Sequence, residues 1–383
     1  MTTSPLAQLQ QLRQDLSAQF PERREVIEGA LHAVLAGEHV FLLGPAGTGK
    51  SALSRAIAQA FGGKYFERLL TRFATPEELF GPISLKALEQ DRYQRVVTDK
   101  LPEAEFAFVD EVFRANSAIL NSLLSAMAER IFHNDGAAPL QIPLVSLFAA
   151  ANDLPDGKEL EALFDRFLLR FDVQYLVRPS NLRAILTAPD PTTSVTLSMD
   201  TLRQAQRDVA QVKVSDATID ALIAIRDACK VEGIVASDRR WKKSLKAVQA
   251  SAYLAGEITT TPEDLFLLTD CLWREPKERS KVARLVGELA DPVSAQAAEI
   301  LDAARETAAR ATAVRSSGSK DDFVAKAAQA LDAFRAQQKK LGELARGAGP
   351  RAAQAILDAN QEINALHSDL ARSLSAGLGL SRA

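Results

Sequence analysis

The sequence predicts an α/β protein, with a three-layer αβα domain around a parallel sheet and all-helical domains after it. Three observations support this fold class. A glycine-rich loop lies between an apolar run of strand length, Val40 to Leu43, and a helical segment. Apolar strands alternate with helices from Val40 to Val177, as in a parallel sheet covered by helices. The sequence after Pro179 contains no further strand-like segments.

Composition narrows the possible functions. The chain has 383 residues, which is too long for one ordinary core. Its 46 basic and 49 acidic side chains leave no overall field that favours nucleic acid or an anionic membrane. The two cysteines, Cys229 and Cys271, lack metal-ligand spacing and favour buried thiols. No apolar run reaches the roughly 18 residues of a membrane span. We therefore expect a cytoplasmic protein without a membrane segment, for which nucleic acid is not the expected partner.

Two helices are predicted before the first strand. Leu6 to Phe20 repeats leucine at helical spacing, and Glu25 to Leu35 places an apolar face on a second helix. In this kind of fold the second segment often forms a wall of the adenine pocket, through Val26 and Ile27 here. Apolar packing alone explains these two residues equally well, so both interpretations remain open.

The loop after the first strand has the residues of a phosphate-binding loop. Its glycines allow a tight turn, so that backbone N–H groups and the following helix N-terminus point at phosphate oxygens. Lys50 is placed to contact the β and γ phosphates, and the Ser51 hydroxyl is placed to bind Mg²⁺. The whole pattern is filled, and the residues expected to hold ATP or ADP are Gly44, Pro45, Ala46, Gly47, Thr48, Gly49, Lys50 and Ser51.

Two later strands end in polar residues. An apolar strand from Phe106 ends in Asp110 and Glu111, and a second buried strand ends in Asn152. Because parallel strands end at one edge of the sheet, Asp110 can hold the Mg²⁺ shell and Glu111 can orient and deprotonate the attacking water. Asn152 can reach the γ-phosphate or that water, although a turn-initiating asparagine is the plainer alternative.

The segments between and after these strands complete the predicted domain. Thr75 and Pro76 open a helix that Gly81-Pro82 interrupts, and Gly81 to Val97 is interpreted as a projecting insertion. Ala115 to Arg130 is predicted as an amphipathic helix. Ile131 to Ile142 is predicted as a hairpin with an Asn134-Asp135-Gly136 turn, on which His133 is exposed and binds no metal. A helix over Glu159 to Phe171 is expected to precede a strand over Asp172 to Val177.

The remaining chain is predicted to be helical, and the expected domains are 1–178, 179–278 and 279–383. Helix starts are indicated at Ser198, Ser215, Asp238 and Thr261. The last domain is rich in Ala, Gln, Lys, Glu and Arg and reads as three helices, Pro292 to Arg315, Asp321 to Arg346 and Ala352 to Ser375. Its sparse apolar stripe suits a small triple-helical bundle without a β-rich insertion, serving as packing or as an adaptor surface.

These motifs together resemble the AAA+ ATPases, and more narrowly their MoxR group, over roughly Pro21 to Trp273. The resemblance rests on GPAGTGKS as Walker A, FAFVDE as Walker B, EVFRANSAILNSLLSAMAERIF, FAAAND as sensor 1, and ALFDRFLLRF. The later strings ASDRRWKKSLKAVQASAYLAG and EDLFLLTDCLW are similar to the RavA branch.

The resemblance implies further roles. Asn152 would be sensor 1, and Arg166 would be the arginine finger that acts on the nucleotide of the neighbouring subunit. Arg239 would be sensor 2, acting from the lid on its own subunit's nucleotide. Other arginines compete for these roles, namely Arg114, Arg170 and Arg240. The expected working form is a homo-oligomeric ring, usually a hexamer, whose usual partner is a protein with a von Willebrand factor A (vWA) domain.

The sequence therefore predicts an Mg²⁺-dependent ATPase that remodels a protein partner in the manner of a chaperone. A DNA-directed motor is a second possibility, but the predicted hairpin from Ile131 to Ile142 contains no Lys or Arg to track phosphates. A third possibility is a nucleotide-switched assembly scaffold with slow turnover. The client and the direction of any force are not encoded in recognisable motifs.

Overall fold

The structure is a computed structural model that describes residues 4–134, 138–177, 179–187, 196–317, 320–346 and 348–377. The chain divides into two compact units, Met1–Ala283 and Arg284–Ala383. The first unit contains both the αβα residues and the helices predicted as a lid. The division falls within helix α13 (Pro276–Ala290), shortly after the predicted boundary at residue 278.

A five-stranded parallel sheet forms the centre of the first unit, in the order β2-β3-β6-β1-β7. Its strands are β1 (His39–Leu43), β2 (Tyr65–Leu69), β3 (Phe106–Asp110), β6 (Ser146–Ala151) and β7 (Phe167–Asp172). Since all strands run in one direction, the sheet has a carboxyl edge, where all strands end, and an amino edge, where all begin. Polar residues that follow different strands therefore meet at the carboxyl edge.

The last strand lies earlier in the sequence than predicted. The expected helix over Glu159 to Phe171 ends at Phe164, as α7 (Lys158–Phe164), and the expected strand over Asp172 to Val177 is replaced by β7. The segment from Phe167 to Phe171 pairs with β1 and is buried on both faces of the sheet. In sequence, an apolar run without clear periodicity is compatible with either a buried helix or a buried strand. Pairing with the sheet decides between them.

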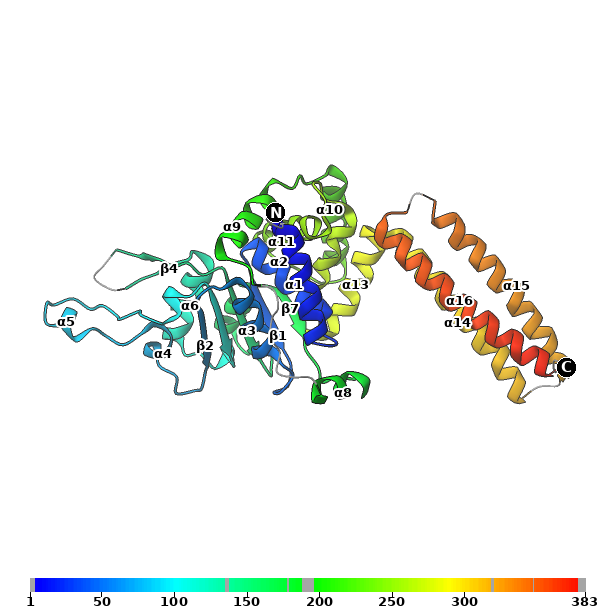
Figure 1. Ribbon diagram of the computed structural model, residues 1–383, viewed down its shortest axis with the longest axis horizontal. Coiled ribbons are helices and arrows are strands. Elements are labelled where there is room, and N and C mark those ends of the chain that lie inside the picture. The colour runs from blue at the N-terminus through cyan, green and yellow to red at the C-terminus, as the bar shows by residue number, and fades with distance from the viewer. Residues whose placement is uncertain are drawn as a thin grey trace. The chain divides into compact units, whose positions relative to one another are not determined.

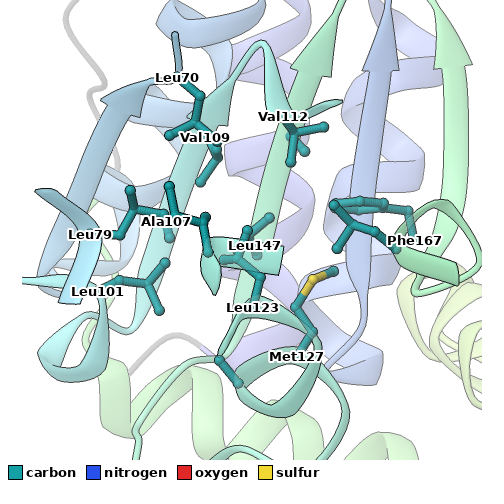
Figure 2. Packing of buried hydrophobic residues seen from close by; sticks show 14 of the residues in the cluster. Leu70, Leu79, Leu101, Ala107, Val109, Val112, Leu123, Met127, Leu147 and Phe167 are labelled. Atoms are coloured by element: carbon teal, nitrogen blue, oxygen red, sulfur yellow. The ribbon is translucent and has the colours of Figure 1, made fainter. Parts of the chain in front are cut away.

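Helices cover both faces of the sheet. One face carries α2 (Arg24–Ala36) and α3 (Lys50–Phe61), and α1 (Pro5–Gln19) packs on both of these helices. Phe61 of α3 stacks on Phe106 of β3 with ring centroids 5.8 Å apart. The other face packs on α4 (Pro76–Phe80), α6 (Ser117–Ala128) and α7. Figure 2 shows this second core, in which Leu123 and Met127 of α6 lie over Ala107 and Leu147 of the strands.

Two insertions project from the same side of the sheet in Figure 1. The first contains α5 (Leu85–Leu88), and the second is the β4 (Ile131–Phe132) and β5 (Leu140–Gln141) hairpin. The Asn134 side chain connects them, because its Oδ1 accepts from the Arg95 N–H at 2.7 Å and its Nδ2 donates to the Arg95 carbonyl at 3.2 Å. Asp135 and Gly136 of the predicted turn lie outside the described residues, whereas His133 is exposed as predicted.

The rest of the first unit is helical. It comprises α8 (Pro179–Thr187), α9 (Met199–Gln211), α10 (Asp216–Val231), α11 (Asp238–Ala255), the 3-10 segment η3 (Pro262–Leu268), α12 (Thr269–Leu272) and the start of α13. The predicted starts are confirmed: Ser198 and Ser215 each accept a backbone N–H, α11 begins at Asp238, and Thr261 forms a capping box with Asp264. The N-cap of α11 is Ser237. The fourth predicted helix is mostly 3-10. Both cysteines are buried and free.

The second unit is a bundle of three helices, α14 (Pro292–Ser317), α15 (Lys320–Leu344) and α16 (Pro350–Gly377), each packing on the other two. Ala297, Ala304 and Ala311 recur every seven residues on α14 and are buried against larger side chains such as Phe334 and Ile363. Small residues allow close approach of the helices. Strands are absent from the described part of this unit. Among the described residues, none of the helices is long and apolar enough to cross a membrane.

Candidate active site

The phosphate-binding loop lies at the carboxyl edge, between β1 and α3. Gly44 must be glycine, because a Cβ there would lie 2.2 Å from the Val173 carbonyl oxygen. Gly49 has φ +84, a left-handed conformation that other residues rarely adopt, and it starts α3. Lys50 donates from Nζ to the carbonyl oxygens of Gly44 and Pro45, each at 2.7 Å. The loop therefore wraps around the ammonium group of Lys50.

The charge of Lys50 is set by two opposing effects. Burial lowers the pKa of its ammonium group, and the nearby carboxylates of Asp110 and Glu111 raise it. The net pKa lies below the ordinary lysine value. Lys50 thus lies near enough to both acids to interact with them electrostatically, as the parallel sheet predicts.

Asp110, Glu111 and Asn152 meet at the carboxyl edge because β3 and β6 are neighbours. Asn152 Nδ2 donates to Glu111 Oε1 at 2.7 Å, and the Glu111 N–H donates to Asp110 Oδ1 at 3.0 Å. Glu111 has φ +51, a conformation that is uncommon outside glycine and occurs at functional turns. A side-chain network therefore connects the ends of two strands beside the phosphate-binding loop.

The residues after Glu111 fix this turn. Val112 and Arg114 belong to η2 (Val112–Arg114), and Val112 is fully buried in the core drawn in Figure 2. The Phe113 ring packs on Phe41, with centroids 5.2 Å apart, and edge-on against Phe164 at 6.0 Å. Arg114 Nε lies 3.6 Å from Glu111 Oε2. Both carboxylate oxygens of Glu111 thus have a partner.

A cavity of about 630 Å³ lies beside the phosphate-binding loop. Its lining comes from the start of α2, the end of β7 and the start of α13: Glu22, Arg23, Arg24, Glu25, Val26, Phe171, Asp172, Val173, Pro276, Arg279 and Ser280. Val26 lines this cavity, and its role near the adenine stays a prediction. Ile27 does not line it and is completely buried, which agrees with the packing interpretation.

The arginines predicted to act on the nucleotide lie elsewhere. Arg166 immediately precedes β7, at the amino edge, and the register pairs Phe167 with His39 at the start of β1. A strand of five residues spans about 16 Å, so the loop at the other end of β1 is that far away. Arg239 Nη2 donates to Asp165 at 3.0 Å, which places Arg239 beside Arg166. This position contradicts the prediction that Arg239 acts on the nucleotide of its own subunit.

The two remaining competitors at this edge are structural. Arg170 is buried and donates to the carbonyls of Phe164, Phe167 and Trp273, with its guanidinium 3.8 Å from the centre of the Phe164 ring. Arg240 is also buried and donates to Asp165 and to backbone carbonyls of β7 and α12. Neither guanidinium is available to a nucleotide, so both cease to be candidates for the finger.

The guanidinium of Arg166 is partly buried and lies near a second arginine, Arg239. Burial lowers its pKa, and the nearby charge of Arg239 lowers it further. Its Nε is buried and has no hydrogen-bond partner within the described part of the chain. For Asp165, burial would raise the pKa, but Arg240 and Arg239 outweigh this and lower it. Arg166 and Arg239 therefore form a cationic pair at the amino edge, with Asp165 as their anion.

Sequence reasoning missed two residues that contact the phosphate-binding loop. Arg23, which precedes α2, donates to the carbonyl oxygens of Thr48 and Gln174, and Tyr175 donates its hydroxyl to the Ala46 carbonyl at 3.2 Å. The contacts of Arg23 with Gln174 and of Tyr175 with Ala46 join segments more than a hundred residues apart, and no local motif indicates them. Arg23 also lines the cavity.

The oxygen ligands beside the phosphate-binding loop suit a magnesium ion better than a metal ion that is coordinated by protein side chains alone. Within the described residues no group of three or more His, Cys, Asp or Glu side chains could hold a metal ion. The candidate ligands are the Ser51 hydroxyl, on the first turn of α3, and the Asp110 carboxylate at the end of β3. Mg²⁺ is commonly held by one or two protein oxygens, with water and substrate phosphates completing the shell.

A parallel sheet with a phosphate-binding loop, an acidic pair on a neighbouring strand end and a helical region after the sheet defines a P-loop nucleotide-binding protein of the AAA+ class. The family model described as "MoxR domain in the MoxR-vWA-beta-propeller ternary systems" matches residues 7–213, and an AAA lid domain model matches residues 217–286. The chain belongs to the MoxR family of AAA+ ATPases.

Individual relatives agree with this assignment. The uncharacterized protein MJ0812 of Methanocaldococcus jannaschii is 44% identical over 72% of this chain and 74% of its own. Protein MoxR of Paracoccus denitrificans is 25% identical over 61% of this chain and 78% of its own. A crystal structure of a proposed ATPase from Cytophaga hutchinsonii has the same fold, with a TM-score of 0.59 and 18% identity over 72% of this chain and 90% of that one. Similarity to the RavA branch stays a prediction.

Proposed function

We propose that this chain hydrolyses ATP with Mg²⁺ and uses the resulting subunit motion to remodel a protein partner. The observation that carries the proposal is the convergence of Lys50, Asp110, Glu111 and Asn152 at one edge of the sheet, where Asn152 is bonded to Glu111. Membership in the MoxR family supports the same activity.

Each residue has a distinct task in this proposal. The N–H groups from Gly44 to Ser51 and the Lys50 ammonium hold the phosphates, while Val26 and the cavity beside it accept the base. Ser51 and Asp110 would hold Mg²⁺, which neutralises charge on the phosphate oxygens. Glu111 orients the attacking water and accepts its proton, and Asn152 keeps the Glu111 carboxylate in place.

A complete site requires a second subunit. Arg166 and Arg239 lie at the amino edge of the sheet, about 16 Å from the phosphate-binding loop of their own chain. We infer that both reach the nucleotide of a neighbouring subunit, where Arg166 supplies positive charge to the transferring phosphate. A heterologous contact of this kind closes into a ring, and a hexamer is the ring expected for this family.

The proposed partner is a protein with a vWA domain. The matching family model is named for MoxR-vWA-beta-propeller systems, which supports this choice. The two insertions joined through Asn134 and Arg95 offer a projecting surface for such a partner or its client. The three-helix bundle is a second surface available for an adaptor.

The test is a Glu111→Gln variant. The amide keeps the size of the side chain but cannot take a proton, so ATP binding should persist while turnover falls by about a hundredfold or more. Glu67→Gln, an exposed acid of β2, is the matched control and should keep wild-type turnover. The variant ring, held in ATP, is then used in a pull-down.

The pull-down distinguishes the three functions. Recovery of a vWA protein supports remodelling of a protein partner. Recovery of nuclease-sensitive DNA identifies a motor instead, and an assembled ring without a partner favours the scaffold. Wild-type turnover in the Glu111→Gln variant would contradict the assigned chemistry.

A further inference from the structure

We propose that Arg114 is a positioning residue that restrains the Glu111 carboxylate of its own subunit and so limits the basal rate of hydrolysis. The inference rests on the proposed role of Glu111 as the base that acts on water. The observation behind it is that each oxygen of this carboxylate has a different partner: Asn152 Nδ2 donates a hydrogen bond to Oε1 at 2.7 Å, and Arg114 Nε forms an ion pair with Oε2 at 3.6 Å.

The backbone dictates the position of Arg114. The Arg114 N–H donates to the Glu111 carbonyl oxygen at 2.8 Å, which closes one turn of 3-10 helix. Such a turn aligns residues i and i+3 on one side, so the guanidinium lies over the carboxylate. Buried Val112 and the packed ring of Phe113 hold the turn in place. The contact between Arg114 and Glu111 is therefore built into the local fold.

The two partners of Glu111 differ in how readily they can move away from its carboxylate. Asn152 follows buried β6, is bonded through one amide hydrogen, and belongs to the proposed catalytic arrangement. Arg114 forms an ion pair with the second oxygen at 3.6 Å, and a water that Glu111 orients through this oxygen competes with that pair. The Arg114 side chain is 43% exposed, so it can turn toward solvent without leaving a buried charge unpaired. Arg114 is therefore the partner that moves away when a water binds to Glu111.

The position of Arg114 also argues against its use as an arginine finger. It follows β3 at the carboxyl edge, on the same side as its own phosphate-binding loop, whereas Arg166 and Arg239 lie at the amino edge. A finger for a neighbouring subunit must face away from its own site. Arg114 instead pairs with the base of its own site.

The experiment measures the single-turnover rate of ATP hydrolysis in Arg114→Ala. Exposed ion pairs shift equilibria by roughly one and a half to fivefold, so the hydrolysis rate should rise by about two- to fivefold while the Kd for ATP stays unchanged. Arg114→Lys keeps a cation at the same position and should restore the wild-type rate. Arg55→Ala, which breaks the exposed pair with Glu67, is the control and should change neither quantity.

A double variant separates positioning from a general structural effect. Because the restraint acts only through the Glu111 carboxylate, Glu111→Gln with Arg114→Ala should hydrolyse ATP at the rate of Glu111→Gln alone. An unchanged rate in Arg114→Ala overturns the inference. A fall of a hundredfold or more also overturns it, since that would place Arg114 on the transferring phosphate. Wild-type turnover in Glu111→Gln would instead sink the proposed function itself.

Discussion

Two neighbouring arginines on the first turn of α11 should give opposite results when each is replaced by alanine. Arg240 is 4% exposed and donates to Asp165 and to the carbonyl oxygens of Phe167, Leu168 and Cys271. Arg239 is 46% exposed at its side chain and donates to the carboxylate of the same aspartate. Arg240 is thus structural, whereas Arg239 is proposed to act on nucleotide.

The expected magnitudes differ accordingly. Arg240→Ala leaves several buried carbonyls without a donor and Asp165 without its buried cation, and removing one partner of a buried pair costs about 3–5 kcal/mol. For a folding unit of this size, that loss lowers Tm by about 6–20 °C. Arg239→Ala removes an exposed pair that contributes at most about 1 kcal/mol, so Tm should hardly change. Its ATP turnover should fall by tenfold or more.

Tryptophan fluorescence is a suitable probe of this difference. The chain has two tryptophans, Trp241 and Trp273, and both lie in the helical part of the first unit. Trp273 is fully buried, and Trp241 adjoins Arg240. Thermal unfolding followed by fluorescence therefore reports the first unit without the bundle. An Arg240→Ala protein of wild-type Tm, or an Arg239→Ala protein as unstable as Arg240→Ala, would refute the assignment.

Three further results are expected. Gly44→Ala should raise the Kd for a fluorescent ATP analogue at least tenfold, because the added Cβ meets the Val173 carbonyl oxygen at 2.2 Å; an unchanged Kd would contradict this placement of the loop. His39 is fully buried, accepts the Leu147 N–H at Nδ1, and has a pKa held well below its ordinary value, first by burial and then by the charge of Arg130. The unfolded histidine gains a proton that the folded one does not, so stability is lost as pH falls below about 6.5, by at most about 1.4 kcal/mol per pH unit for this one group; His39→Gln should make this dependence shallower in urea titrations, and an equally steep profile would argue against it. Ala304→Leu should overpack the bundle and destabilise it by about 1–3 kcal/mol, which circular dichroism detects and tryptophan fluorescence does not; a shared shift of both signals would contradict independent unfolding.

The carboxyl edge of the sheet could be predicted from sequence because its residues follow strands directly. Asp110 and Asn152 each come after an apolar run, and the ends of neighbouring parallel strands meet in space. The same local reasoning located the helix caps, such as Ser198 and Ser215. In these cases the physical cause lies within a few residues of the feature itself.

The position of β7 and the roles of the arginines could not be obtained in this way. The run from Phe167 to Phe171 suits a helix or a strand, and only its pairing with β1 decides. Arg166, Arg170, Arg239 and Arg240 look alike in sequence, although two are buried among carbonyls and two are not. Burial and partner identity are set by tertiary contacts, so no local pattern separates these four residues.

The arrangement around Asp165 gives the lid a direct connection to the amino edge. Arg239 and Arg240 both belong to α11, and both bind the aspartate that precedes Arg166. Lys243 of the same helix donates to Glu38, just before β1, at 2.6 Å. Any tilt of α11 must therefore strain or break contacts on both sides of Arg166. Movement of the lid and placement of Arg166 are therefore mechanically coupled within one chain. In the ring proposed above, a nucleotide that shifts the lid of one subunit would also move the arginine that this subunit presents to its neighbour.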